Sequence, residues 1–262
     1  MKILITGGAG FIGSHLVFAL QEKGHDVTVI DNLSSGNSEN LKGFTGNLIK
    51  GDITTLNLSS KFKNKKFDII FHLASITDTT FSDEKEMIRS NVEGFRNILN
   101  FAKFIKAKLI YASSAGVYGR GKIPMREEQE LQPLNPYALS KRMMDDMVKK
   151  DTKKDSITII GLRYFNVYGP KEKYKGKSAS MIYQLYVQMK NGKRPKIFKW
   201  GEQKRDFIYV KDATLANLKA MGTERGCIVN IGTGILTSFN RIIGILNQIL
   251  RTNYEPEYFD NP

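Results

Sequence analysis

The chain has 262 residues, 41% of them hydrophobic and 25% charged, which is typical of a globular protein with a large core and excludes a disordered chain. No apolar run approaches the ~20 residues that a membrane span needs, and the single cysteine, Cys227, fits a reducing compartment, so we expect a cytoplasmic protein without a membrane partner. The net charge of +14 would suit nucleic acid, but the lysines are scattered and no nucleic-acid-binding module accompanies them, so we expect a basic surface instead.

Five short runs rich in β-branched residues alternate with amphipathic stretches along the first part of the chain. The runs predict buried parallel strands at residues 2–6, 26–30, 68–73, 108–112 and 157–162. The clearest helical patterns cover residues 11–23, which Gly24 ends, 83–104 and 137–150. This alternation predicts an α/β fold with a doubly wound parallel sheet and right-handed crossovers.

The alternation loosens after residue 168. A lysine-rich loop is followed by a predicted helix at 179–190 and by short strands around Ile197 and Phe207. We therefore predict one domain at 1–168 and a smaller lobe, mainly 169–262, that caps the carboxyl edge of the sheet. Segments around 205–231 are expected to return to the first domain, because 228–231 is another apolar strand, and the lobe is either minimal or truncated at its end.

A glycine-rich turn joins the first predicted strand to the first predicted helix. Gly7 permits the tight turn, Gly10 lets a pyrophosphate approach the backbone, and Gly13 lets helix and strand pack closely. The intervening Phe11 and Ile12 open the helix. Strand, turn and helix in this order predict a Rossmann-type site for a dinucleotide.

Asp31 ends the second predicted strand, 18 residues beyond Gly13. Its carboxylate can accept hydrogen bonds from a ribose diol and would repel a 2′-phosphate, which favours NAD over NADP. Asp52, in the segment Gly51-Asp52-Ile53 between the second and third of these predicted strands, either reaches the adenine amino group or caps the following helix. Neighbouring residues assigned to the same site are Asn32, Ile53, Leu73 and Ala74.

Tyr137 and Lys141 lie one helical turn apart and therefore share a helix face. A nearby ammonium and a positive nicotinamide ring would both favour the phenolate of Tyr137, which could then take a proton from a sugar hydroxyl. Ser114, just past the fourth of these strands at the edge where ligands of such sheets bind, either contacts the same hydroxyl or serves as a turn residue.

Four segments together resemble the extended short-chain dehydrogenase/reductases, specifically the NAD-dependent epimerase/dehydratase family that acts on nucleotide sugars. The segments read GGAGFIG at 7–13, SSAGVYG at 113–119, tyrosine and lysine at 137 and 141, and RYFNVYGP at 163–170. The resemblance implies that Ser114, Tyr137 and Lys141 form the catalytic trio. Sugar 4,6-dehydratases carry an Asp-Glu pair where this chain has Ala115 and Gly116, so an epimerase that oxidises and re-reduces its sugar is the better interpretation.

Residues 169–180, with 201–207 and 77–80, are most similar to the ADP-glycero-manno-heptose 6-epimerases. This resemblance implies oxidation at C6 of the sugar, with Lys175 as a second catalytic base; the alternative is one more solvated lysine in this loop. It also implies one tightly bound NAD or NADP per subunit and a homo-oligomer, for example a dimer through helices 83–104 and 137–150. The implied substrate-binding residues, besides Ser114 and Lys175, are Thr79, Asn91, Asn166 and Arg205.

Asn166 and Arg205 are expected at the diphosphate, because a guanidinium donates in a planar fork that suits phosphate oxygens, and Asn91 is expected to position the active-site loop. No metal site is assigned. Three alternatives stay open. Asp31 favours NAD whereas the heptose epimerases often use NADP, the substrate could be a UDP-hexose epimerised at C4, and the chain could be a non-catalytic dinucleotide-binding or RNA-binding relative.

Overall fold

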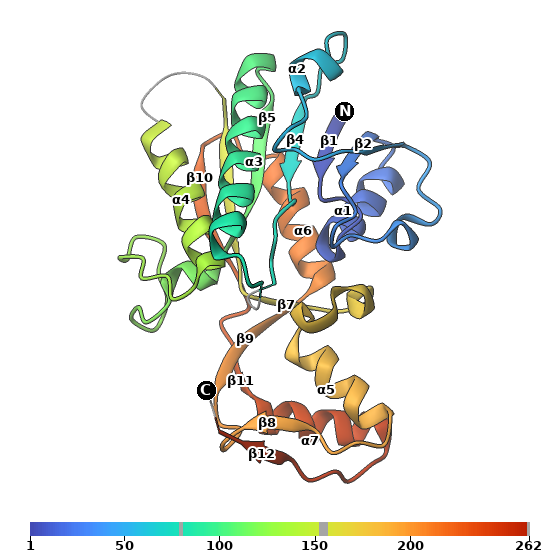
Figure 1. The fold of residues 1–262 in the computed structure, drawn as a ribbon, viewed down its shortest axis with the longest axis vertical. Coiled ribbons are helices and arrows are strands. Elements are labelled where there is room, and N and C mark those ends of the chain that lie inside the picture. Colours follow the sequence, from blue (N-terminus) through green and yellow to red (C-terminus); the bar gives the residue numbers. More distant parts are fainter. Residues whose placement is uncertain (79–80, 152–156, 261–262) are drawn as a thin grey trace.

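The computed structural model describes residues 1–78, 81–151 and 157–260 and centres on a seven-stranded parallel sheet (Figure 1). The strand order is β10-β6-β5-β4-β1-β2-β3, with every neighbouring pair parallel. The predicted doubly wound, Rossmann-type fold is confirmed. The strands are β1 Lys2–Thr6, β2 Asp26–Asp31, β3 Asn47–Lys50, β4 Ile69–His72, β5 Lys108–Ser114, β6 Ile159–Tyr164 and β10 Cys227–Ile231.

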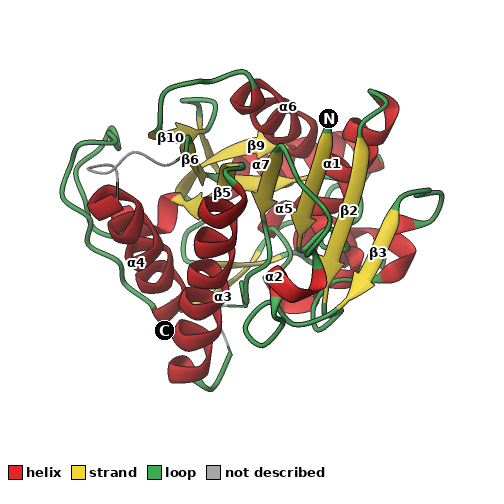
Figure 2. Cartoon of the chain, turned by 90° about the horizontal axis from the view of Figure 1, so that it is seen from above, coloured by secondary structure: helices red, strands yellow, loops and turns green. Residues whose placement is uncertain are grey.

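Helices cover both faces of this sheet (Figure 2). On one face, α1 (Phe11–Glu22) and α6 (Val210–Met221) contribute side chains to the core, and on the other face α3 (Glu84–Ile105) and α4 (Pro136–Asp151) do so. The short α2 (Leu58–Lys61) lies against α3. Asp83 starts α3 by accepting a hydrogen bond from the backbone N–H of Glu86, as an N-cap residue should.

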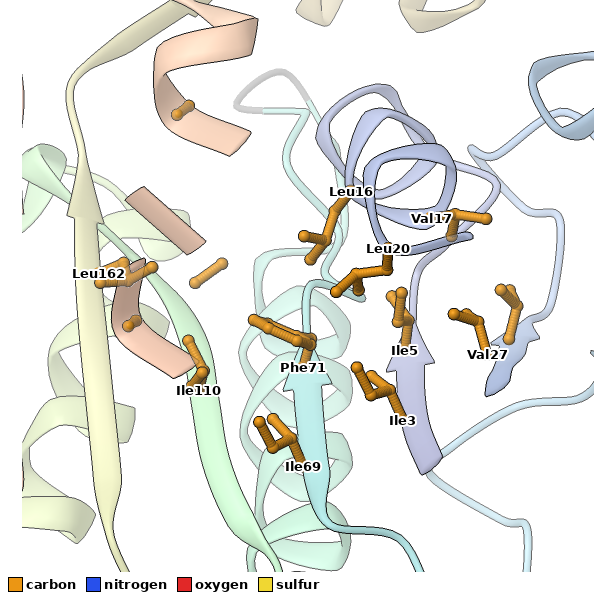
Figure 3. Close-up of a cluster of buried hydrophobic side chains, with 14 of the residues drawn as sticks. Ile3, Ile5, Leu16, Val17, Leu20, Val27, Ile69, Phe71, Ile110 and Leu162 are labelled. Atoms are coloured by element: carbon orange, nitrogen blue, oxygen red, sulfur yellow. The ribbon is translucent and has the colours of Figure 1, made fainter. Parts of the chain in front are cut away.

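The core follows from the two-residue period of the strands. Ile3 and Ile5 point toward the α1 face (Figure 3). Leu4 points toward the α3 face, and all three side chains are fully buried. The same alternation separates Ile69 and Phe71 from Ile70. A strand buried on both sides must be apolar at every position, and this explains the continuous apolar runs in the sequence.

The second lobe lies beyond the carboxyl ends of the main strands (Figure 1). Its small sheet joins β7, β9 and β11, and β8 pairs with β12. Helices α5 and α7 pack their apolar faces together with Ile197. The elements are β7 Asn166–Tyr168, α5 Met181–Lys190, β8 Lys196–Phe198, β9 Lys204–Tyr209, β11 Leu236–Ser238, α7 Phe239–Leu250 and β12 Glu257–Phe259, with 3₁₀-helices at Ser38–Leu41, Ala115–Tyr118 and Glu172–Ser178.

Several predicted boundaries were wrong. The strand expected at 157–162 runs from Ile159 to Tyr164. The strand expected to end at residue 112 continues through Ser114, because Ser113 and Ser114 still pair with β6. The helix expected from 179 begins at Met181, because the Ser180 hydroxyl accepts a hydrogen bond from the backbone N–H of Tyr183 and so caps the helix. Within the described ranges, no helix is long and apolar enough to cross a membrane.

Candidate functional site

The glycine-rich turn brings three backbone segments into close contact at the carboxyl end of β1. Gly7 has φ +71°, and a Cβ atom there would lie 2.5 Å from the backbone nitrogen of Ala74. A Cβ atom at Gly13 would lie 2.1 Å from the carbonyl oxygen of Gly7. Gly10 caps α1 without a side-chain hydrogen bond, so the first-turn N–H groups can face an anion. The turn therefore has the geometry that a dinucleotide pyrophosphate requires.

Asp31 lies at the end of β2 and fixes this turn. One carboxylate oxygen accepts the backbone N–H of Ala9 at 2.9 Å, and the other accepts that of Leu33 at 2.8 Å. Burial raises the pKa of Asp31, and these two hydrogen bonds oppose the rise. Each oxygen keeps a second lone pair, so the carboxylate can still accept from a ribose hydroxyl. Two residues of the following loop, which the sequence reasoning missed, also support the turn: the backbone N–H of Asn37 and the side-chain amide of Asn40 both donate to the carbonyl oxygen of Ala9.

Asp52 occupies an exposed turn beside β3. Its Oδ1 accepts both the backbone N–H and the hydroxyl of Thr54, and its Oδ2 accepts from Asn32 at 3.4 Å. The helix-capping alternative for Asp52 is wrong, because α2 begins only at Leu58 and is capped by Asn57. Binding of the adenine amino group therefore remains a prediction, and Oδ2 of Asp52, which faces Asn32, is the oxygen that would accept from it. The side chains of Ile53 and Leu73 pack partly against the core clusters.

Ser114, Tyr137 and Lys141 come together at the carboxyl end of β5. The Ser114 hydroxyl hydrogen-bonds the Tyr137 hydroxyl, and its oxygen accepts the backbone N–H of Gly116 at 3.1 Å. Lys141 Nζ lies 5.7 Å from the centroid of the Tyr137 ring and donates to the carbonyl oxygen of Ala112 at 2.8 Å. This hydrogen bond fixes the ammonium behind the phenol.

The electrostatics of the trio follow from burial. Lys141 is 1% exposed, and burial lowers its pKa to about 8 while Asp145 opposes the change. Burial also raises the pKa of Tyr137, and the hydrogen bond from Ser114 partly opposes this rise. In the protein alone the phenol therefore holds its proton at neutral pH. A cationic ring bound beside it would favour the phenolate.

A buried charged network lies beneath Lys141, and the sequence reasoning missed it. Asp145 and Arg163 form an ion pair of 2.9 Å with both side chains fully buried. The Tyr111 hydroxyl donates to Asp145 at 2.8 Å, and Arg163 donates to the Tyr118 hydroxyl at 2.7 Å. One signal was available: Arg163 interrupts the apolar run of β6, and a charge in a central strand requires a partner.

Asn91 reaches the site from α3. Its side chain accepts the backbone N–H of Ile76 at 2.8 Å and donates to the carbonyl oxygen of Ile76 at 3.1 Å and to the Ser140 hydroxyl at 3.0 Å. Asn91 is only 4% exposed, so its placement favours the loop-positioning role over direct contact with a sugar. The predicted substrate residue Thr79 lies outside the described residues.

Asn166, Lys175 and Arg205 line one cavity of about 700 Å³ in the second lobe. Asn166 donates to the carbonyl oxygen of Asp206 and is otherwise exposed, and the Arg205 guanidinium is exposed as well. Lys175 Nζ lies 5.3 Å from the centroid of the Phe11 ring, and burial lowers its pKa. Lys175 therefore lies between the glycine-rich turn and the cavity, which is unlike a solvated lysine. The fold brings Arg205 to the same cavity as Asn166 and Lys175, which lie at least 30 residues before it in the sequence.

Comparison with known proteins identifies the family. The model of the NAD dependent epimerase/dehydratase family matches residues 3–232. The chain is 39% identical over 259 residues to an ADP-L-glycero-D-manno-heptose-6-epimerase of Brachyspira hyodysenteriae, a match that covers 95% of this chain and 81% of that protein.

Two solved structures are also similar. The ADP-L-glycero-D-manno-heptose-6-epimerase of Helicobacter pylori has a TM-score of 0.93 and 41% identity, with 99% of this chain and 84% of that one covered. The UDP-glucose 4-epimerase of Thermotoga maritima, solved with UDP-glucose, has a TM-score of 0.94 and 33% identity, with 100% and 86% covered. The backbone is therefore equally similar to epimerases of both kinds, and backbone similarity does not distinguish them.

Proposed function

The chain belongs to the NAD dependent epimerase/dehydratase family, and from this premise we propose that it is an ADP-glycero-manno-heptose 6-epimerase, which oxidises the sugar transiently at C6 and reduces it again. The main observation in support is the position of Lys175, which is partly buried between the glycine-rich turn and the cavity that Asn166 and Arg205 line. A second proton-transfer group at this place suits a sugar that must be deprotonated and reprotonated from two sides. The higher identity to the heptose epimerases supports the same substrate.

The residues of the first domain fit the cofactor. The turn at Gly7, Gly10 and Gly13 leaves room for a pyrophosphate, and the Asp31 carboxylate would hold the adenosine ribose. The carboxylate would repel a 2′-phosphate, which agrees with the NAD dependence of the family. When bound, the nicotinamide supplies reversible two-electron oxidation of a sugar carbinol to a ketone.

Tyr137 and Lys175 are proposed to handle the proton of the sugar hydroxyl. For one epimer, Tyr137 Oη takes the hydroxyl proton as the ketone forms, while Ser114 holds the oxygen and the Lys141 ammonium stabilises the phenolate. For the other epimer, Lys175 Nζ takes the proton, and burial favours its neutral, basic form by lowering its pKa. When the first epimer is converted into the second, Tyr137 gains a proton during oxidation and Lys175 gives one up to the new hydroxyl during reduction. In the opposite direction the two groups exchange these roles, and proton exchange with solvent restores both.

Asn166 and Arg205 are proposed to bind the diphosphate of the substrate, because the guanidinium provides a planar set of donors at the cavity wall. The net charge of +14 would attract such an anion. We also propose a cytoplasmic homo-oligomer that assembles through α3 and α4, since Leu139 and Met143 on α4 are 38% and 36% exposed.

The substrate is tested by incubating the purified protein separately with ADP-glycero-manno-heptose, UDP-glucose and UDP-galactose, and by resolving the epimers chromatographically. We expect the heptose nucleotide to reach an epimeric equilibrium and the UDP-hexoses to react at least about tenfold more slowly, since a buried polar contact left unpaired by the wrong substrate costs about 1–3 kcal/mol. Turnover of the UDP-hexoses alone would overturn the proposal in favour of a 4-epimerase.

A further inference from the structure

The segment from Gly169 to Ser180 links β7 to α5 and carries Lys175 in its 3₁₀-helix. Every second residue between 171 and 177 is a lysine: Lys171, Lys173, Lys175 and Lys177. Only one carboxylate belongs to it, that of Glu172, and it is 1% exposed. An acidic side chain is rarely buried so fully unless it is fully hydrogen-bonded. The partners of Glu172 therefore indicate its role.

Glu172 hydrogen-bonds both ends of its own loop. One carboxylate oxygen accepts the backbone N–H of Gly169 at 2.9 Å and the Ser180 hydroxyl at 3.0 Å, and the other accepts the backbone N–H of Ser180 at 2.6 Å. Ser180 is also the residue that caps α5. The carboxylate thus joins the end of β7 to the beginning of α5 and closes the loop.

Glu172 and Lys175 are three residues apart in a 3₁₀-helix, so they lie on the same side of it. The loop is also attached to the cofactor domain next to Glu172. Lys171 Nζ donates to the carbonyl oxygen of Asn40 at 2.8 Å, and a ring nitrogen of His15 lies 3.1 Å from the carbonyl oxygen of Pro170. Glu172 joins the two ends of the loop, and Pro170 and Lys171 attach it to the cofactor domain. The turn that carries Lys175 therefore has little conformational freedom.

We propose that Glu172 is a positioning residue, which clamps the loop between Gly169 and Ser180 and thereby holds Lys175 Nζ at the place where it exchanges a proton with substrate. This inference rests on the proposed function, because it gives Lys175 the second proton-transfer role. Glu172 does not touch the substrate in this account. Its charge also opposes the lowering of the Lys175 pKa that burial causes, so the free amine keeps more of its affinity for a proton.

The test compares the holoenzyme variants Glu172→Ala, Glu172→Gln and Lys175→Met with Glu224→Ala, an exposed acidic residue before β10 as matched control. Each epimer of the heptose nucleotide is mixed separately with enzyme, and the first reduction of bound cofactor is followed by its absorbance. Lys175→Met identifies the epimer whose proton Lys175 takes. Glu172→Ala should slow cofactor reduction by that epimer by about 10- to 100-fold and leave the rate with the other epimer within about twofold of the parent. The rates of Glu172→Gln should lie between those of Glu172→Ala and the parent.

A second readout is independent of activity. Hydrogen exchange of the amides at Gly169 and Ser180 should accelerate in Glu172→Ala, because that substitution removes the carboxylate that accepts from both. It should remain unchanged in Glu224→Ala. If Glu172→Ala does not fold, Glu172→Gln carries both measurements. Equal slowing of both epimers, or a Glu172 variant that matches the control, would overturn the inference. A parent enzyme that reacts with neither epimer would instead overturn the proposed function.

Discussion

Tyr137→Phe is expected to reduce kcat by about 10²–10⁴-fold, the range that a positioned general acid or base contributes. The substitution keeps the ring and removes only the hydroxyl that bonds Ser114, so binding and folding should change little. Cofactor content, measured by denaturing the protein and assaying the released dinucleotide, should match that of the parent. The loss would therefore lie in proton transfer.

The matched control is Tyr186→Phe on α5, whose ring contacts Tyr183 and the Lys190 ammonium. It should epimerise at the parental rate. A Tyr137→Phe enzyme as fast as the parent would remove the phenol from the mechanism and would favour a dinucleotide-binding protein whose trio is not catalytic.

Asp145→Asn is expected to destabilise the fold by about 3–5 kcal/mol, because it leaves the fully buried Arg163 guanidinium without its counter-charge. This is a large part of the ~5–15 kcal/mol by which domains are stable. Urea unfolding followed by circular dichroism measures the change. The neighbouring Asp146→Asn is the control, since its pair with Arg142 at 3.6 Å is 43% exposed on both sides and should contribute at most about 1 kcal/mol.

Asp145→Asn should also change the pH dependence of turnover. The Asp145 carboxylate favours the charged form of Lys141, whose pKa is about 8. Removing the carboxylate lowers that pKa further, so the ammonium loses its proton at lower pH and the alkaline decline of kcat should move to lower pH. Equal stability of Asp145→Asn and Asp146→Asn, with superimposable pH profiles, would contradict the importance of the buried network.

Much of the fold could be predicted because its signals are local. The apolar runs of β1, β2, β4, β5 and β6, the glycine turn and the helix boundaries all depend on residues close together in sequence. Gly7 and Gly13 were predicted for the right reason, since a side chain at either position would collide with backbone. The small lobe was predicted less fully, because its three-residue strands contain too few residues to show a period.

The site was predicted unevenly for a different reason. Tyr137 and Lys141 share one helix, so their spacing alone placed them together. The ion pair of Asp145 with Arg163 joins a helix to a central strand, and only the tertiary structure brings the two into contact. Glu172 was missed as well, because it accepts from the backbone N–H groups of Gly169 and Ser180 at the two ends of the loop, and no sequence motif displays such contacts.

In the proposed reaction the sugar is oxidised and reduced at a single carbon without exchange of the carbon-bound hydrogen. The direct measurement uses ADP-glycero-manno-heptose that carries deuterium at C6, with mass spectrometry of the epimer formed in ordinary water. We expect the product to keep its deuterium at C6, since the atom removed from one face is the one returned to the other. Loss of the deuterium to solvent during epimerisation would contradict it.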